Sequence, residues 1–340
     1  MLELLLTGAS GYIGGAVLDR FVKANIPNLR ITAFARNKSY ADKIAAIYSD
    51  YDLSVEVGEA GYDDPVFSTL VSNADIIVHT GNSSDDQLSA NVIAAGIKDG
   101  ALLIHTSGTY ILTDESENDT LVTRKFDDEA DIETITSWGL EHHHRDIDLK
   151  ILGIHAVKPK VNTIVVCPPL IYGNSSGPIN KVSQQIPITI RIAAQAKANR
   201  CFGEGNAIWS SVHIDDLADF YLLLLTTYLR NPSELAMNEL GYYFAESGEQ
   251  SWKSLVSALD APLVKYGVID ENHTSKTEKP WSVSDLAQVL GEKSAQGLYK
   301  AFISNSGSKA TRARKLGWQP KMGDVYAYLD EAVKTFVDGR

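Results

Sequence analysis

The sequence predicts an α/β fold: a doubly wound parallel sheet with a smaller C-terminal α/β domain. Short apolar runs rich in β-branched residues alternate with stretches of helical periodicity through the first half of the 340 residues, as in a parallel sheet covered by helices on both faces. The first run, residues 2–7, leads directly into a glycine-rich turn and then into a helical stretch. A strand, a tight glycine turn and a helix in this order open a nucleotide-binding sheet.

Each expected element follows from the spacing of its apolar residues. Strands of the sheet are expected at residues 2–7, 30–35, 53–57, 75–79, 102–105 and 163–167. The helices between them are expected at residues 13–24, 40–48, 65–71, 87–98 and 141–156. Later elements are strands at 211–213 and 241–245 and helices at 188–198 and 215–229. The polar, acidic residues 113–131 are expected to form a surface excursion before the long helix.

The glycines of the first turn are spaced Gly8-x-x-Gly11-x-x-Gly14. Gly8 permits the turn, Gly11 lets a pyrophosphate approach the backbone, and Gly14 allows the helix to pack closely on the strand. The N–H groups at the start of the helix then face the phosphate charge. The pattern predicts a dinucleotide site with contacts from Thr7, Gly8, Ser10, Gly11, Tyr12, Ile13 and Gly14.

The end of the second strand predicts which dinucleotide binds. It reads Ala35-Arg36-Asn37-Lys38, at a point where a carboxylate would accept hydrogen bonds from a free 2′-hydroxyl. A cation here pairs instead with a 2′-phosphate, so Arg36 and Lys38 favour NADP(H) over NAD(H). The alternative is that both side chains only extend into solvent from a loop.

Composition narrows the class of protein. The chain is 44% hydrophobic and 22% charged, and its formal net charge is -12, which argues against a nucleic-acid partner. No apolar run approaches the length of a membrane span, and two cysteines are too few for a disulfide framework. We therefore expect a cytoplasmic protein whose partner is a small-molecule substrate, with no nucleic acid and no membrane.

Several segments, in this order, resemble those of one family. They are TGASGYIG at residues 7–14, His79-Thr80-Gly81, Thr106-Ser107-Gly108, PPLIYG at 168–173, VHIDDLA at 212–218 and KLGWQP at 315–320. The chain thereby resembles the extended short-chain dehydrogenase/reductases, the group that contains nucleotide-sugar epimerases and dehydratases. The resemblance implies an NADP-binding Rossmann domain, residues 1–173 and about 206–235, and an interleaved substrate domain, residues 174–205 and 236–340. It also implies a cofactor cleft that includes His79, Thr80, Gly81, Thr106, Ser107, Pro168 and Leu170.

The chemistry of that family depends on a Tyr-x-x-x-Lys motif, in which the lysine lowers the pKa of the tyrosine and the tyrosine exchanges a proton with the substrate. No such motif occurs in this sequence. Where the family has it, the chain reads Leu140-Glu141-His142-His143-His144-Arg145-Asp146-Ile147-Asp148. Alignment on Asp148 puts His144 at the lysine position and Leu140 at the tyrosine position, and a shift of one residue makes Arg145 the substitute.

Four residues are therefore candidates for catalysis. The resemblance places Ser107 where the family's hydroxyl binds the reacting oxygen. His144 or Arg145 would hold the ribose or pyrophosphate as a cation, and a neutral His144 would also serve as acid or base; the alternative is an Arg145–Asp148 pair on the surface of a helix. Tyr110 would supply the missing phenol, unless it only packs beneath the insertion. No metal is expected, because consecutive helical histidines point about 100° apart.

The preferred hypothesis is an NAD(P)-dependent oxidoreductase or epimerase-like enzyme acting on a small carbonyl or hydroxyl compound. Two alternatives belong to other classes. One is an isomerase or cyclase that keeps NADP(H) as a structural part, and the other is an NADP(H)-sensing protein without turnover. The resemblance also implies a possible homodimer through the helices expected near residues 87–98 and 141–156.

Overall fold

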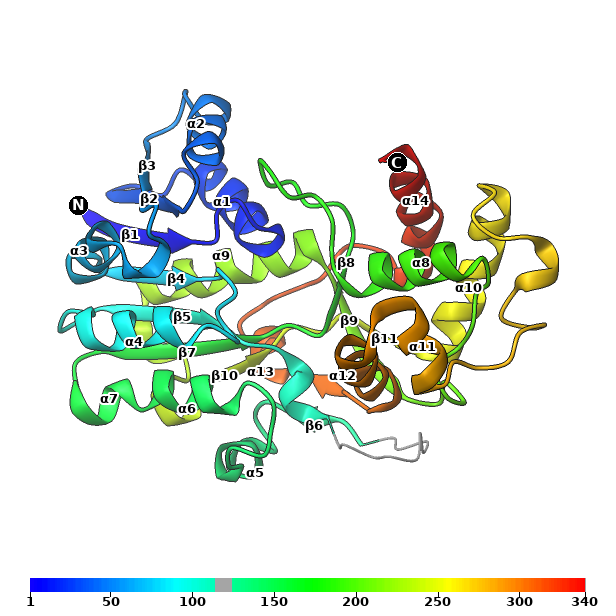
Figure 1. Ribbon diagram of the computed structural model, residues 1–340. Coiled ribbons are helices and arrows are strands. Elements are labelled where there is room, and N and C mark those ends of the chain that lie inside the picture. The colour runs from blue at the N-terminus through cyan, green and yellow to red at the C-terminus, as the bar shows by residue number, and fades with distance from the viewer. Residues whose placement is uncertain (114–123, 340) are drawn as a thin grey trace.

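The computed structural model describes residues 1–113 and 124–339, and it is organised around a seven-stranded parallel sheet (Figure 1). The strand order is β10-β7-β5-β4-β1-β2-β3. The strands are β1 (Leu2–Thr7), β2 (Leu29–Ala35), β3 (Leu53–Val57), β4 (Ile76–His79), β5 (Leu102–Thr106), β7 (Asn162–Cys167) and β10 (Tyr242–Phe244). The central strands contain buried apolar runs, at residues 4–6, 76–78, 102–104 and 164–166, because both faces of the sheet are covered. The doubly wound α/β fold expected from the sequence is confirmed.

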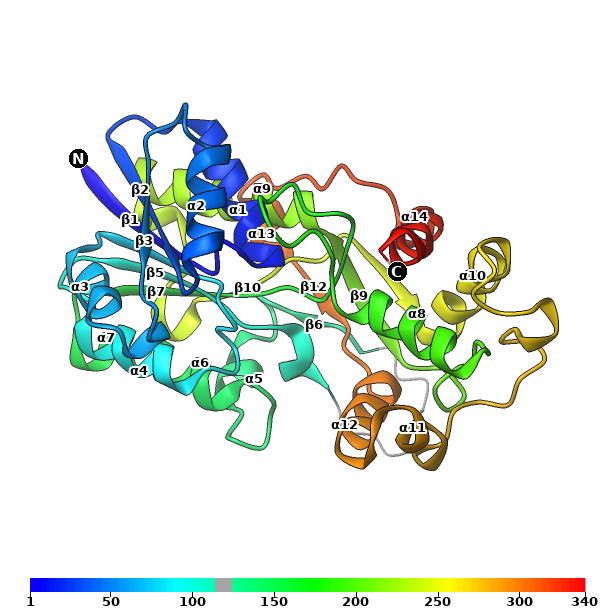
Figure 2. The ribbon, with the colours of Figure 1, turned by 45° about the horizontal axis from the view of Figure 1, so that its top comes forward.

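Helices cover both faces of this sheet (Figures 1 and 2). One face carries α1 (Tyr12–Ala24), α2 (Lys38–Ile47) and α9 (Ile214–Arg230). The other carries α3 (Pro65–Asn73), α4 (Gln87–Gly96), α6 (Arg145–Leu152) and α7 (Ile154–Val157). The single long helix expected at 141–156 is wrong. His144 has a left-handed backbone (φ 62°), a conformation that a helix interior does not accept, so α6 begins only at Arg145.

A second, smaller sheet and its own apolar core lie beyond the carboxyl ends of the main strands. Its strands are β8 (Leu170–Tyr172), β9 (Ile208–His213) and β11 (Gly248–Ser251). The helices around it are α8 (Gln185–Ala196), α10 (Trp252–Lys265), α11 (Val283–Leu290), α12 (Glu292–Ile303) and α14 (Val325–Asp338). The expected domain boundaries differ from this division at three strands. β8 and β9 belong to the small sheet, and β10 extends the edge of the main sheet next to β7.

The segment expected as a surface excursion is partly internal. Residues 114–123 lie outside the described residues, but β6 (Phe126–Asp127) pairs with β12 (Ser308–Lys309), just before α13 (Thr311–Lys315); the short α5 (Ile132–Ser137) follows β6. Asp128 is fully buried, and its carboxylate accepts hydrogen bonds from the N–H groups of Phe244 (2.9 Å) and Arg312 (3.0 Å). These acidic residues therefore tie the C-terminal segment to β10. Within residues 1–113 and 124–339, no helix has the length and apolarity to cross a bilayer.

Candidate functional site

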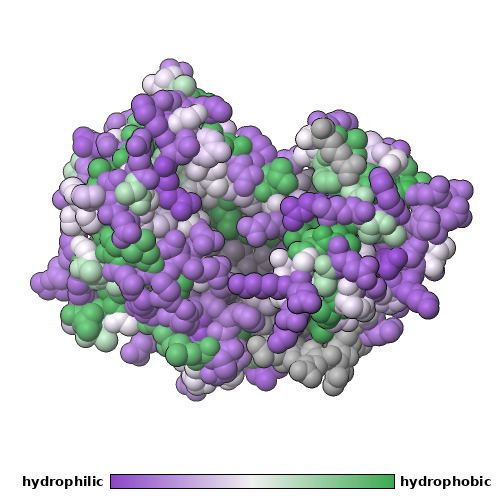
Figure 3. Space-filling view, in the orientation of Figure 1, coloured by the Kyte–Doolittle hydropathy of each residue, from purple (hydrophilic) through white to green (hydrophobic). Residues whose placement is uncertain are grey.

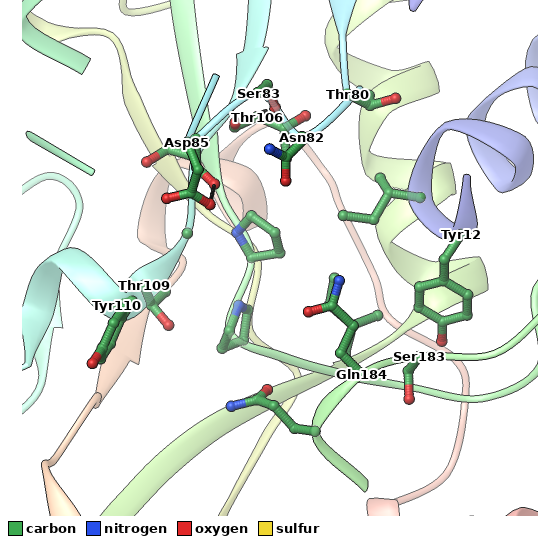
Figure 4. A pocket seen from close by; sticks show the side chains of 18 of the residues that line it. Tyr12, Thr80, Asn82, Ser83, Asp85, Thr106, Thr109, Tyr110, Ser183 and Gln184 are labelled. Atoms are coloured by element: carbon green, nitrogen blue, oxygen red, sulfur yellow. Dashed lines mark hydrogen bonds between the residues drawn. The ribbon is translucent and has the colours of Figure 1, made fainter. Parts of the chain in front are cut away.

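A pocket of about 540 Å³ lies where the carboxyl ends of the sheet strands meet the smaller domain. The parallel register aligns these ends, since Thr7 pairs with His79, His79 with His105, and Thr106 with Val166. The surface is hollowed between the part around α1 and α2 and the part around α8 and α14 (Figure 3). In the close view, Tyr12 and Ser183 lie on one side of the pocket and Tyr110 on the other (Figure 4). Ligands of open α/β sheets bind at this edge.

The glycine turn fits a dinucleotide phosphate. Gly8 has a positive φ of 74°, and a Cβ on Gly14 would lie 2.3 Å from both the Gly8 carbonyl oxygen and Thr80 Oγ1. Gly11 is the N-cap of α1, and no side chain caps that end of the helix. The first N–H groups of α1 are therefore directed at the pocket edge formed by Gly11, Tyr12 and Ile13, as phosphate binding requires.

The loop that follows β8 packs over this turn. The Tyr12 hydroxyl donates a hydrogen bond to the Gly173 carbonyl (2.7 Å), and Ser175 Oγ donates to the Tyr12 carbonyl (3.0 Å). The N–H of Asn180 donates to the Ser10 carbonyl (3.3 Å). The expected contact residue Ser10 thus anchors this loop through its backbone, while Pro168 from the start of the segment lines the pocket. Leu170 is fully buried in the core of the smaller domain instead.

Thr7 and His79 form a buried cluster beneath the pocket. His79 Nδ1 lies 2.7 Å from Thr7 Oγ1 and its Nε2 lies 3.0 Å from Ser89 Oγ. Burial lowers the pKa of His79 to about 4, so the ring is neutral. Thr80 Oγ1 donates to the Thr7 carbonyl (2.7 Å) and also lines the pocket. The cluster thereby fixes the ends of β1 and β4 against each other, and His79 itself is enclosed.

The residues after β2 carry the cations expected at the adenosine ribose. The Arg36 guanidinium carbon lies 5.3 Å from the centre of the Tyr62 ring, and the Tyr62 hydroxyl donates to the Gly81 carbonyl (2.8 Å). Lys38 is exposed and its Nζ lies 2.9 Å from the Asp42 carboxylate. Arg36 thus lies against an aromatic ring just after β2, whereas Lys38 is paired along its own helix.

His144 is positioned at the pocket by its backbone and by an acidic partner. It directly precedes α6 in a left-handed conformation, and its Nδ1 lies 3.1 Å from Asp85 Oδ1. A Cβ on Gly108 would lie 3.5 Å from His144 Nε2, so this nitrogen faces the Ser107-Gly108 end of β5. Burial alone lowers the pKa of His144, but the hydrogen bond and charge of Asp85 outweigh it and raise the pKa above 6.5.

Ser107 connects the pocket to a buried carboxyl group. Its Oγ donates to Asp148 Oδ2 (3.1 Å), and the Tyr242 hydroxyl donates to the same oxygen (3.0 Å). Asp148 Oδ1 has no hydrogen-bond partner among the described residues. Burial raises the pKa of Asp148 to about 6, so a proton remains on this group into mildly acidic solution. Thr106, the preceding residue, lines the pocket with its Oγ1 2.5 Å from the Tyr221 hydroxyl.

Arg145 points away from the pocket. Its guanidinium is buried and donates to the carbonyls of Trp138 (2.9 Å) and Thr136 (2.6 Å) and to the Tyr242 hydroxyl (2.5 Å). The alternative of an Arg145–Asp148 pair on a helix surface is also wrong, because both residues are buried. Arg145 therefore stabilises the loop before α6 and does not line the pocket.

The rings of His142, His143 and His144 pack against the aromatic side chains of Tyr110 and Trp138. Tyr110 lines the pocket, and its ring stacks on that of His143 with centroids 3.9 Å apart. His142 stacks on Trp138 (4.2 Å), and its Nδ1 lies 2.9 Å from the Ile111 carbonyl oxygen. The helix on which the expectation of separated histidines rested is absent here, since α6 begins only at Arg145. No metal-binding group of His, Cys, Asp or Glu occurs in the described part of the chain.

Asp85 is the residue that sequence reasoning missed. It belongs to the polar run Asn82-Ser83-Ser84-Asp85 directly after β4, and all four residues line the pocket. Their position directly after β4 is the feature of the sequence that indicates a site role, because the loop after a central parallel strand reaches the ligand edge of the sheet.

Comparison with known proteins agrees with this fold. Residues 4–238 match the model of the NAD dependent epimerase/dehydratase family, and the chain belongs to that family. A relative described as oxidase ucsJ, from an Acremonium species, is 25% identical over 336 residues, which cover 87% of this chain and 91% of the relative.

Three solved structures share the fold over nearly the whole chain. The dTDP-glucose 4,6-dehydratase DesIV of Streptomyces venezuelae, solved with NAD, has a TM-score of 0.66 at 14% identity and covers 100% of this chain and 98% of its own. Gre2 of Candida albicans, in complex with NADPH, has a TM-score of 0.63 at 14% identity, with both chains covered fully (100%). The UDP-glucose 4-epimerase of Thermotoga maritima has a TM-score of 0.61 at 13% identity, with 99% of each chain covered.

Proposed function

We propose that this protein is an NADP(H)-dependent oxidoreductase that interconverts a carbonyl and a hydroxyl group of a small molecule. The observation that carries the proposal is the Asp85–His144 pair beside Ser107, at the edge of the sheet where the glycine turn meets the pocket. A titrating group with a carboxylate partner, next to a hydroxyl donor, is a proton-transfer arrangement. The family and its solved members support the class of reaction.

The bound nicotinamide would supply or accept the hydride. On substrate binding, the Ser107 hydroxyl, directly after β5, would turn from Asp148 Oδ2 and donate its hydrogen bond to the substrate oxygen. For reduction of a carbonyl, the protonated His144 would give its Nε2 proton to that oxygen, while Nδ1–H remains bonded to Asp85. For oxidation, neutral Nε2 would remove the hydroxyl proton. Asp85 stays ionised throughout, because the His144 hydrogen bond lowers its pKa.

The register of the missing motif also follows from this geometry. Leu140, which the sequence alignment placed at the tyrosine position, is 72% exposed, whereas His144 lines the pocket. His144 and Asp148 are four positions apart, the spacing of Tyr-x-x-x-Lys, and both are adjacent to the Ser107 segment. We therefore place His144 at the tyrosine position and Asp148 at the lysine position.

The choice of NADP(H) rests on Arg36. Neither Arg36, Asn37 nor Lys38 is a carboxylate that would bind a free ribose 2′-hydroxyl. The stacking of Arg36 on Tyr62 holds its charge at the end of β2, where a 2′-phosphate would pair with it.

The test is absorbance at the reduced nicotinamide band, with NADPH and a panel of aldehydes and ketones. NADPH oxidation that depends on a carbonyl compound and on His144 supports the oxidoreductase. Tight NADPH binding with no oxidation in the presence of any panel member overturns it and favours the sensor. Conversion of a substrate without net NADPH consumption selects the isomerase or cyclase.

We further infer a homodimer through α4 and α6. Lys150 Nζ of α6 binds Gln87 Oε1 (2.6 Å) and Asn91 Oδ1 (2.5 Å) of α4, so the two helices form one surface. Leu88 and Leu149 on it are about two-fifths exposed (40% and 39%). Exposed leucines on adjacent helices provide the apolar centre that a symmetric interface needs.

A further inference from the structure

We propose that the substrate of this pocket is an uncharged, largely apolar carbonyl or hydroxyl compound, and not a nucleotide-linked sugar. This assignment rests on the proposed oxidoreductase function and names its substrate class. It distinguishes this chain from two solved structures that share its fold, a dTDP-glucose 4,6-dehydratase and a UDP-glucose 4-epimerase.

The first argument is the charge of the pocket wall. Among the described residues that line it, only Asp85 and His144 have side chains that carry a charge near neutral pH, and these two pair with each other. Neither lysine nor arginine occurs in that lining. A sugar diphosphate brings two negative charges, which proteins bind with Arg or Lys side chains or with helix N-termini. The charged side chains of this wall are therefore already paired, and the wall has no free cation for such an anion.

Two lysines adjacent in sequence to lining residues do not themselves line the pocket. Lys181 lies between the lining residues Asn180 and Val182, but its Nζ donates to the carbonyls of Ser176 (3.2 Å) and Gly177 in its own loop. Lys300 precedes the lining residue Ala301 on α12 and is exposed.

The N-terminus of α8 also reaches the pocket, through Gln184 and Gln185. Its third residue is Pro187, which removes one of the N–H donors that an anion would need there. In the proposed function, the cofactor phosphates would bind at the start of α1. Neither helix end therefore replaces the missing cations.

The second argument is the apolar and aromatic part of the wall. Tyr110 and Trp209 line one end of the pocket with ring centroids 6.2 Å apart. Trp209 Nε1 donates to the Ser304 carbonyl (2.8 Å), so the polar edge of the indole is satisfied and its apolar surface is presented. Ile171, Val182 and Ala301 extend this wall. The pocket also includes the cofactor edge at Gly11, Tyr12 and Ile13, so these apolar side chains, together with neutral polar residues, enclose the part that remains for the substrate.

The test measures binding separately from turnover, by calorimetry on the full chain saturated with NADPH. The probes are 2-acetylnaphthalene as a neutral aryl ketone, and UDP and UDP-glucose as nucleotide anions. We expect the ketone to bind and both nucleotides to fail at millimolar concentration. Binding of either nucleotide to the wild-type protein in competition with the ketone, or failure of the ketone to bind, overturns the proposal.

A matched pair of variants tests the electrostatic reason. Gln184→Arg places a cation in the pocket wall, and Gln195→Arg places one on an exposed position of the same helix α8. Gln184→Arg should increase the affinity for UDP by at least about tenfold, and Gln195→Arg should not. A Gln184→Arg protein that still rejects UDP overturns the proposal.

The outcomes also separate this inference from the proposed function. A ketone that binds without NADPH oxidation supports the substrate class and overturns the oxidoreductase. NADPH oxidation driven by UDP-glucose supports the oxidoreductase and overturns the substrate class.

Discussion

Asp85 and His144 are 59 positions apart in the chain, yet Asp85 Oδ1 and His144 Nδ1 lie 3.1 Å apart at the pocket. One residue follows β4 and the other precedes α6, so the pair exists only because the parallel sheet brings these two loops together. A carboxylate fixes the tautomer and the orientation of an imidazole and favours its charged form. We propose that His144 of this pair takes the place of the family's tyrosine.

The pair predicts unequal losses for its two members. His144→Gln removes the proton donor and should lower kcat for carbonyl reduction by about 10² to 10⁴. Asp85→Asn keeps a polar partner but removes its charge, so it should lower kcat by a smaller factor and move the pH profile to lower pH. Steady-state rates across pH measure both effects, and Glu141→Gln, at an exposed carboxylate of the same segment, is the control. An unshifted profile in Asp85→Asn would contradict the positioning role.

The direction of the pH dependence follows from the raised pKa of His144. Reduction needs the protonated ring, so its rate should be highest below this pKa and fall as pH rises through it. Oxidation of the corresponding alcohol needs the neutral ring and should rise over the same interval. Initial rates in both directions, at saturating cofactor, give the two profiles. Parallel profiles would assign the proton transfer to another group.

Arg36→Ala should distinguish the two cofactors. Only NADPH carries the 2′-phosphate, so its Kd should rise by about 10- to 100-fold, while that of NADH changes little. Lys38→Ala is the matched control, because the pairing of Lys38 with Asp42 predicts a smaller effect. Fluorescence titration measures all four affinities. An equal loss for NADPH and NADH would remove the basis for NADP(H).

The sequence was sufficient for the sheet and for the glycine turn because both depend on local patterns. The apolar runs and the spacing of Gly8, Gly11 and Gly14 have a physical meaning that needs no distant partner. The sequence wrongly predicts a helix at the loop before α6, because the conformation of this loop depends on contacts with distant residues. Its left-handed His144 is held by contacts with Asp85 and the rings around Tyr110, which the local sequence does not contain.

Of the residues expected in the site, some reach the pocket and others do not, for the same physical reason. Ser107 and Thr80 reach the pocket because strand ends fix them, and the alternation along a strand is a local property. His79 and Leu170, one residue away from pocket residues, are buried instead. Arg145 faces the interior because α6 begins later than expected, so the residues that face the cleft differ from those of a longer helix.

The dimer surface can be tested at Leu149. Leu149→Asp puts a charge at the centre of the α4–α6 surface, and burying it in an interface would be costly. We expect a monomer at micromolar concentration where the wild-type protein is a dimer, measured by sedimentation velocity. Tyr326→Asp changes an exposed apolar residue of α14, on the other domain, and should leave the dimer intact. A wild-type monomer would contradict the inference.

Asp148 predicts a pH dependence of stability. Burial raises its pKa to about 6 in the folded chain, against about 3.9 in an unfolded one, so between these values the native state holds a proton that the unfolded state has lost. The stabilisation is therefore complete below the lower value and is lost as pH rises through the higher one.

Asp148→Asn keeps the shape of the side chain and removes this titration. Between about pH 4 and pH 7, the wild-type protein should lose about 2 to 4 °C more in Tm than the variant does. Asp128, whose pKa burial also raises to about 6, is present in both proteins and cancels in the comparison. Asp128→Asn should give a separate and additive change, because Asp128 contacts α13 and β10 and not Ser107. Identical pH dependence in the wild-type and Asp148→Asn proteins would mean that Asp148 is ionised in the native state, and that the Ser107 hydrogen bond is made to a carboxylate.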